Sequence, residues 1–114
     1  MSHCRSLLIC IALAGCTAPR PPLVVTDPDP AVKIPAIKKA VRTDNTSTIP
    51  HLIVDLDSDD PAVRFYAISG LERLTGETFG YRYYMDEEQR KPYLIKWRNW
   101  LDNHNSPATA RAIR

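Results

Sequence analysis

The chain has 114 residues, of which 44% are hydrophobic, and its 15 Lys and Arg side chains against 13 Asp and Glu give a formal net charge of +2. A chain of this length forms one small domain with short appendages, which excludes a large multidomain enzyme. The near balance of charges argues against a nucleic-acid-binding surface, which needs a strong basic excess.

The N-terminus has the outline of an export signal. Arg5 supplies a positive charge, and an apolar run follows over residues 6–15. A membrane-spanning helix needs about 20 apolar residues, and Pro19 and Arg20 interrupt this run well short of that length. We therefore expect a cleaved signal peptide over residues 1–15 and no permanent transmembrane anchor.

The apolar run ends in Leu13, Ala14, Gly15 and Cys16. This order of an apolar residue, two small residues and Cys resembles the lipobox of bacterial lipoproteins. The resemblance implies cleavage after Gly15 and a diacylglycerol or other acyl lipid on the Cys16 sulfur. The protein would then be exported and held on a bacterial membrane, at the periplasmic face or in the outer membrane. The alternative is a plain secretory cleavage near Ala14 or Ala18, which would leave Cys16 without a role.

The expected cleavage site also divides the three cysteines between the signal peptide and the mature chain. Cys4 and Cys10 would leave with the signal peptide, and Cys16 would remain as a thioether. We therefore expect no disulfide, no Cys-based metal site and no thiol catalyst in the mature chain.

The two segments at the ends of the mature chain are predicted to be extended or flexible. Residues 16–28 are rich in Pro and contain no Gly. Such a composition predicts a stiff tether, in which Thr17 to Asp27 would span roughly 30 Å in a polyproline-like conformation. Residues 105–114 show no apolar period, which predicts a flexible tail.

An internal repeat follows the tether. Residues 29–37 align with residues 60–68, which lie 31 positions further on, and six of the nine aligned residues are identical. The Asp-Pro pair that opens each copy is a helix start, because the carboxylate caps free amides and Pro lacks the amide that would stay unpaired. The shared Val and Ala-Ile at equal offsets indicate a repeat rather than two unrelated helices.

Two amphipathic helices meet at the second copy. The first has apolar residues at i, i+3, i+4 and i+7, as one helix face requires, and these are Ile49, Leu52, Ile53 and Leu56. The second carries a facing stripe, Val63, Ala67, Leu71 and Leu74. Gly76, directly after this stripe, is predicted to end the second helix. With a turn over residues 57–60, we expect an antiparallel hairpin that needs neighbours on either side.

The hairpin resembles HEAT repeats, particularly the compact HEAT-like units of bacterial proteins. The resemblance rests on Pro50, Asp60, Val63, Arg64, Ala67 and Leu71. It implies an all-α domain over residues 29–104, built as a short HEAT-like stack of helical hairpins, in which Arg64 contacts a turn Asp across the stack. Pro35 stands where the second copy has Tyr66. Proline there would bend or delay the first helix, so we expect a partial first unit.

An aromatic, turn-rich connector leads into a last helix over residues 87–104. Asp86 with Gln89 three residues later suits a capping pair. One face of this helix would close the open end of the stack, so that the helix acts as a C-terminal cap. That face carries Tyr93, Trp97, Trp100, Leu101 and His104. Pro92 either kinks the helix or marks its true start.

The chain has little that resembles a catalytic or metal site. Asp55, Asp57 and Asp59 alternate as in a calcium loop, but the sixth position lacks the required Gly. His51 and His104 have no second His or Cys at helical spacing. We therefore expect no catalytic residue, no metal and no cofactor other than the lipid.

Anchor, tether and repeat together predict a membrane-tethered, non-enzymatic module that presents a helical surface to a protein partner in the cell envelope. One rival is a small enzyme subunit or cofactor-handling factor, because some bacterial HEAT-like proteins resemble bilin lyases. Another is a glycan-binding cell-wall lipoprotein, in which Tyr81, Arg82 and Tyr84 stack on a sugar or clasp a peptide. Packing of the connector on the last helix is the simpler account of these aromatic residues.

Overall fold

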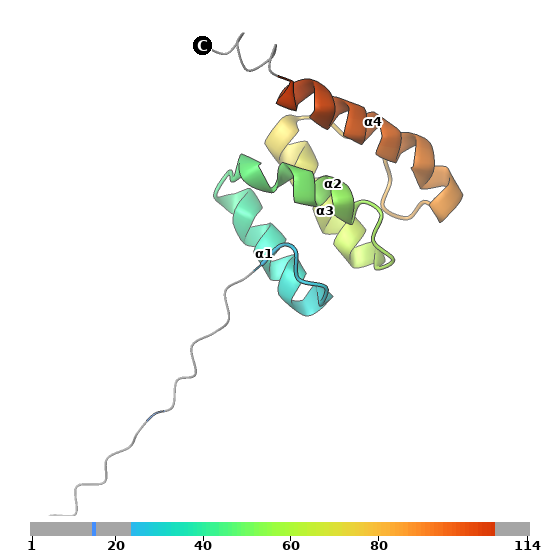
Figure 1. Cartoon of the computed structure of the whole chain (residues 1–114). Coiled ribbons are helices and arrows are strands. Elements are labelled where there is room, and N and C mark those ends of the chain that lie inside the picture. Colours follow the sequence, from blue (N-terminus) through green and yellow to red (C-terminus); the bar gives the residue numbers. More distant parts are fainter. Residues whose placement is uncertain (1–14, 16–23, 107–114) are drawn as a thin grey trace, which may run out of the picture.

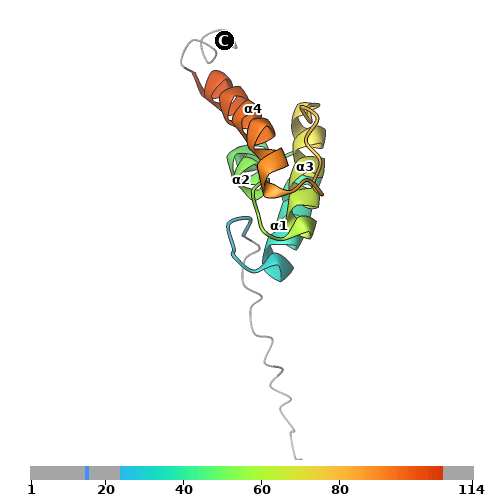
Figure 2. The same cartoon turned by 90° about the vertical axis from the view of Figure 1, so that its right-hand side faces the viewer.

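The computed structural model describes residue 15 and residues 24–106, and every regular element in this part of the chain is a helix. The elements are α1 (Pro30–Arg42), the short 3-10 helix η1 (Thr46–Thr48), α2 (Ile49–Asp55), α3 (Pro61–Thr75) and α4 (Glu87–Asn105). Figures 1 and 2 show α1 and α3 side by side in one layer, and α2 and α4 in a second layer. The prediction of an all-α fold is confirmed for the described residues.

The two copies of the repeated segment begin their helices in the same way. The Asp29 carboxylate accepts a hydrogen bond of 2.9 Å from the amide of Ala31. The Asp60 carboxylate accepts one of 2.7 Å from the amide of Ala62. Both Asp residues have extended backbone, and Pro occupies the first helical position in each case. The predicted helix starts are therefore confirmed, and α1 and α3 are the equivalent helices of the two copies.

Pro35 does not delay the first helix, since α1 begins at Pro30 and continues through Pro35. A residue at this position would normally donate its amide to the carbonyl of Ala31. Both Pro35 and Ala31 are exposed, so water can reach that carbonyl. The solvent-facing position explains why a proline is tolerated inside the helix.

A glycine permits the close packing of α1 and α2 on α3. A Cβ atom on Gly70 would lie 2.8 Å from Cγ2 of Val41 and 3.2 Å from Cδ1 of Leu52. Side chains do not approach a Cβ that closely without displacement, so any larger residue would displace the Val41 and Leu52 side chains from their packing.

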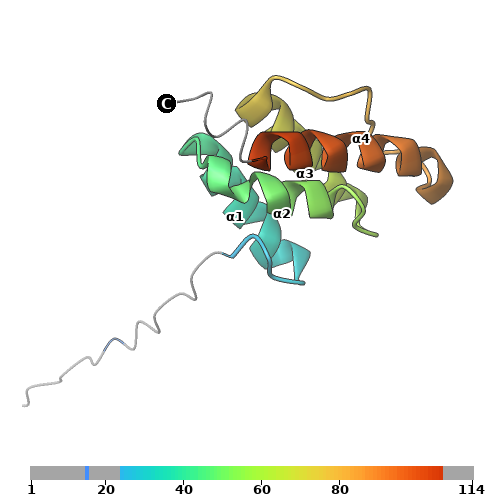
Figure 3. The same cartoon turned by 45° about the horizontal axis from the view of Figure 1, so that its top comes forward.

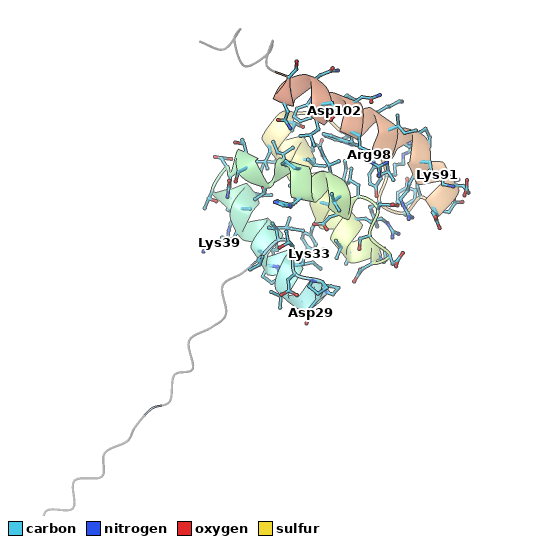
Figure 4. The ribbon with its side chains drawn as sticks, in the orientation of Figure 1. Asp29, Lys33, Lys39, Lys91, Arg98 and Asp102 are labelled. Carbon is cyan, nitrogen blue, oxygen red and sulfur yellow. The ribbon has the colours of Figure 1, made fainter. Side chains whose placement is uncertain are left out.

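The core lies between the two layers, and its largest fully buried side chains come from all four helices. They are Trp97, Ile37, Leu52, Leu56, Leu71 and Val63. Trp97 of α4 makes edge-to-face contacts with Phe79 at 4.8 Å and Trp100 at 5.8 Å between ring centroids. The aromatic face of α4 therefore covers the α2–α3 hairpin, while Lys91, Arg98 and Asp102 line its exposed side (Figure 4).

The start of α4 is set by a complete capping box. The Asp86 carboxylate accepts from the amide of Gln89 at 2.8 Å, and the Gln89 side chain accepts from the amide of Asp86 at 3.1 Å. The helix begins at Glu87 and runs through Pro92 to Asn105. Pro92 is exposed and is not the true start of the helix, and α4 extends one residue beyond the predicted end. Figure 3 shows the connector running along α4 from the end of α3, so α4 doubles back.

The chain joins the helical body before residue 29. Val25 is half-buried and packs against the core. The amide of Asp27 donates to the carbonyl of Val24 at 3.1 Å, and the amide of Asp29 donates to the Asp27 carboxylate at 2.8 Å. The end of the predicted tether therefore lies on the body. The predicted signal peptide, apart from the exposed Gly15, and the predicted tether before Val24 lie outside the described residues.

A largely buried ion pair joins α1 to α2. The Lys33 ammonium lies 2.7 Å from the Asp55 carboxylate, and the Asp55 side chain is 5% exposed. Burial raises the pKa of Asp55 above its ordinary value, although the ammonium of Lys33 opposes this shift. Asp55 thus belongs to a helix contact, and it does not share a loop with the Asp residues of the following turn.

Gly70→Val is expected to lower the free energy of unfolding by about 2 kcal/mol, because the new side chain overpacks the contact with Val41 and Leu52. Thermal or urea unfolding monitored by circular dichroism measures the change. Glu72→Val on the exposed side of the same helix is the control and should change stability by less than about 0.5 kcal/mol. Equal losses in both variants would show that the helix contact is not the cause.

Candidate binding surface

The three residues of the predicted binding surface do not lie together at the surface. Tyr81 is only 4% exposed, and its hydroxyl donates a hydrogen bond of 2.5 Å to the carbonyl of Leu56. Arg82 and Tyr84 are exposed. The prediction that Tyr81 contacts a ligand is therefore corrected, because its ring fills the core and its hydroxyl has a partner within the chain.

The shape of the connector explains the inward position of Tyr81. Gly80 has a φ of +81° and Phe79 has a φ of +53°. The amide of Tyr81 donates to the carbonyl of Thr78 at 3.0 Å. Two successive left-handed residues reverse the chain, and the ring after them enters the core. The spacing of hydrophobic residues in the sequence does not predict this reversal. The burial of Tyr81 therefore could not be predicted from the sequence pattern.

Arg64 fixes the connector against the hairpin. Its side chain is largely buried, and Nη1 donates to the carbonyls of Ser58 at 2.6 Å and Asp59 at 3.1 Å. Nε donates to the carbonyl of Tyr83 at 2.8 Å. The expected contact with a turn carboxylate is wrong, because the nearby Asp60 carboxylate caps α3. The guanidinium instead satisfies backbone carbonyls, for which its fork of donors is well suited.

A row of four aromatic rings, one half-buried and three exposed, crosses α3 and the connector. Tyr66 contacts Phe65, Phe65 contacts Tyr83, and Tyr83 contacts Tyr84, each edge to face, with centroid separations of 5.2, 5.2 and 5.3 Å. Phe65, Tyr83 and Tyr84 are 43%, 37% and 64% exposed. We call these four rings the aromatic strip. Contiguous exposed aromatic side chains are typical of binding surfaces, because they bury much area at little entropic cost.

One end of the aromatic strip opens into a groove between α1 and α3. Its volume is about 380 Å³, and the residues that line it are Ile37, Lys38, Val41, Arg42, Tyr66, Ser69, Gly70 and Arg73. Tyr66 belongs to both features. We call this hollow the α1–α3 groove. A second hollow of about 330 Å³ lies at the other end of the strip, where Arg82 and Tyr84 face Gln89 and Tyr93.

The α1–α3 groove has a positive rim. Lys38, Arg42 and Arg73 line it, and none of its lining residues carries a carboxylate. The Lys38 ammonium lies 5.6 Å from the centroid of the Tyr66 ring, within cation–π distance. The arrangement has no nucleophile paired with a base. It can bind an anionic group beside an apolar one.

The repeat-signature residues serve the fold. Val63, Ala67 and Leu71 are buried in the core, and Pro50 is exposed at the start of α2. His104 stacks on Trp100 at 3.8 Å between centroids. No cluster of three or more His, Cys, Asp or Glu that a metal ion could share occurs in the described part of the chain. Within residue 15 and residues 24–106, no helix has the length and apolar character to cross a bilayer.

Tyr81→Phe is expected to cost about 1–3 kcal/mol at neutral pH, because it leaves the buried Leu56 carbonyl without a donor. Burial also raises the pKa of Tyr81 from 10.0 to about 12. An unfolded chain therefore loses this proton near pH 10, whereas the folded chain holds it until about pH 12. The stabilisation by the Tyr81 hydroxyl is complete below pH 10 and declines as the pH rises towards 12.

Urea unfolding of the wild type and Tyr81→Phe between about pH 8 and pH 11 measures this decline. The difference in stability between the two proteins should shrink over the alkaline part of the range. Tyr84→Phe, at an exposed ring, is the control and should match the wild type throughout. A wild-type advantage that stays constant into the alkaline range would contradict the assignment.

Comparisons with known proteins do not assign this surface to a family. No protein-family model, curated protein or solved structure matches the chain.

Proposed function

We propose that this protein is a membrane-tethered, non-catalytic HEAT-like module of the bacterial cell envelope that binds a protein partner. The observation that carries the proposal is the aromatic strip, which has three exposed rings and is continuous with the α1–α3 groove through Tyr66. Aromatic and Arg side chains are the residues that most often dominate protein interfaces. Here they come from α1, α3 and the connector, so that the helical packing holds them in a fixed arrangement.

Two observations support the HEAT-like part of the proposal. α1 and α3 have the same Asp cap and the same proline at the first helical position, 31 residues apart in the sequence. The two helices lie side by side in one layer, while α2 and α4 form the other (Figures 1 and 2). Stacked helical hairpins place equivalent helices next to each other in this way.

The tether is proposed from sequence alone. The order Leu13, Ala14, Gly15, Cys16 resembles a lipobox, and a lipid on Cys16 would hold the domain near other envelope proteins. Confinement at a membrane raises the effective concentration of two partners, so a weak surface contact can suffice for binding.

Cell-wall glycan is the second candidate ligand. Tyr84 is the most exposed ring of the strip, and it lines the hollow that also contains Arg82 and Gln89. An exposed ring beside hydrogen-bonding side chains suits the apolar face and the hydroxyl groups of a sugar.

Cys16→Ser is expected to move the protein from the membrane fraction to the soluble fraction of lysed cells, because the serine hydroxyl cannot carry the thioether-linked lipid. Fractionation with mass spectrometry of the N-terminal fragment measures location and lipid together. Cys10→Ser, within the apolar run, is the matched control and should stay on the membrane. Unchanged membrane retention and mass of the Cys16→Ser protein would overturn the tether.

Partner binding is tested by cross-linked affinity purification from intact cells that express either the wild type or Cys16→Ser. We expect an envelope protein that is enriched with the wild type and reduced with the variant. Absence of any enriched protein in both samples would overturn the proposed function.

Truncation of the strip in Phe65→Ala/Tyr84→Ala should leave stability within about 1 kcal/mol, because both rings are exposed. The same change should lower recovery of the partner at least about tenfold, as expected when aromatic anchors are removed from an interface. Val54→Ala/Ile95→Ala removes exposed apolar side chains from α2 and α4 and should not affect recovery. Co-sedimentation with purified cell wall tests the glycan candidate. If glycan is the ligand, the wild type and Val54→Ala/Ile95→Ala should pellet with the cell wall, and Phe65→Ala/Tyr84→Ala should not.

A further inference from the structure

We propose that the α1–α3 groove binds an extended acidic segment of a protein, with one apolar side chain on the groove floor and carboxylates on Lys38, Arg42 and Arg73. This inference deepens the proposed function and rests on it, because it specifies the chemistry of the partner. The acidic groups of the segment would contact the rim of the groove, and the aromatic strip would form the adjoining part of the binding surface.

The first support is the state of the three rim cations. Among the described residues, the buried and half-buried cations have partners: Lys33 pairs with Asp55, Arg90 pairs with Asp57, and Arg64 donates to backbone carbonyls. Within the same part of the chain, the exposed side chains of Lys38, Arg42 and Arg73 form no ion pair or hydrogen bond, and the Lys38 ammonium lies over the Tyr66 ring. Three unpaired cations from two neighbouring helices, with no carboxylate in the lining, form a local excess of positive charge.

The chemistry of the rim selects carboxylates. Guanidinium groups present parallel N–H donors that match the two oxygens of a carboxylate, so Arg42 and Arg73 favour Asp and Glu side chains. These two residues come from α1 and α3, on either side of the hollow. A bound segment would therefore have acidic residues on both sides of its central residue.

The floor of the groove adds an apolar requirement. Ile37 and Val41 of α1 contribute side chains, and Gly70 of α3 contributes bare backbone, so the hollow exists because α3 has no side chain there. Its volume of about 380 Å³ lies near the lower end of the range for ligand pockets, about 300–1,000 Å³. The groove is open to solvent. That shape suits one apolar side chain of a chain lying across it better than an enclosed small molecule.

The aromatic strip extends the same surface. Tyr66 lines the groove and contacts Phe65, which contacts Tyr83 of the connector. A protein segment anchored in the groove can continue over these rings, whereas an anionic membrane surface is flat and would meet the rim but not the floor. We therefore favour an acidic protein segment over lipid head groups.

The test uses the full chain carrying Cys16→Ser and three sets of short fluorescent peptides. The first set has Glu and Asp on both sides of one Leu, the second replaces the acidic residues by Gln and Asn, and the third replaces the Leu by Ser. Fluorescence anisotropy measures binding at low and at high salt. Vesicles containing an anionic phospholipid form a fourth probe, measured by co-sedimentation.

Lys38→Glu and Lys39→Glu are the matched variants. The two exposed lysines are neighbours on α1, yet Lys38 lines the groove and Lys39, labelled in Figure 4, lines a different hollow. Arg73→Glu tests the opposite side of the groove. All three sites are exposed, and circular dichroism of each variant verifies that the fold is kept.

The acidic Leu peptides should bind the unsubstituted groove, more weakly at high salt. Lys38→Glu and Arg73→Glu should each weaken binding about tenfold or more, as expected for loss of a charge-assisted contact, and Lys39→Glu should have less than about a twofold effect. Peptides lacking the acidic residues or the Leu should bind about tenfold more weakly. The inference would be overturned if the peptides with Gln and Asn bound as tightly as the acidic peptides. It would also be overturned if Lys38→Glu and Lys39→Glu lost the same amount of peptide affinity. So would binding to vesicles, but not to peptides, that depends on Arg73.

This inference and the proposed function fail in different ways. An envelope partner captured by the wild type, combined with no peptide binding, would overturn the groove assignment alone. Peptide binding that depends on Lys38 and Arg73, without any tether-dependent partner in cells, would overturn the proposed function and support the groove assignment.

Discussion

The close approach of α1 and α3 at Gly70 is the contact on which the surface of this protein depends. Because no side chain separates the helices there, Val41 and Leu52 reach the backbone of α3. The same approach brings the basic residues of α1 within one groove of Arg73 on α3. A larger residue at position 70 would therefore overpack the contact with Val41 and Leu52 in the core and also occupy the floor of the groove at the surface. Stability and binding are coupled through this one position.

The turn that follows α2 has backbone carbonyls that no helix pairs. The last carbonyls of α2 accept from the amides of residues 56–58, whereas the carbonyls of the turn itself are bound by two side chains. The hydroxyl of Tyr81 donates to the carbonyl of Leu56, and Arg64 donates to the carbonyls of Ser58 and Asp59. The same two side chains hold the connector in place, since Tyr81 belongs to it and Arg64 binds the carbonyl of Tyr83. The connector part of the aromatic strip is therefore held against the turn between α2 and α3 by Tyr81 and Arg64.

Local signals in the sequence predicted the local structure well. The Asp-Pro starts, the capping box at Asp86 and the stop at Gly76 each depend on residues within one turn of each other, and all appear as expected. The mistaken predictions concern contacts between segments distant in sequence. Tyr81 is buried because the connector reverses at Phe79 and Gly80. Arg64 binds backbone carbonyls, while Asp60 caps α3. The α1–α3 groove joins residues from two helices, so no single stretch of sequence reveals it.

The identical starts of α1 and α3 have a consequence for how such a chain can change in evolution. Each start is self-contained, because the capping Asp binds an amide only two residues away and the proline follows directly. A copied stretch of gene therefore carries a complete helix start with it and does not depend on its new neighbours to form one. Gain or loss of a unit would change the length of the surface while leaving each helix able to begin at the same residue.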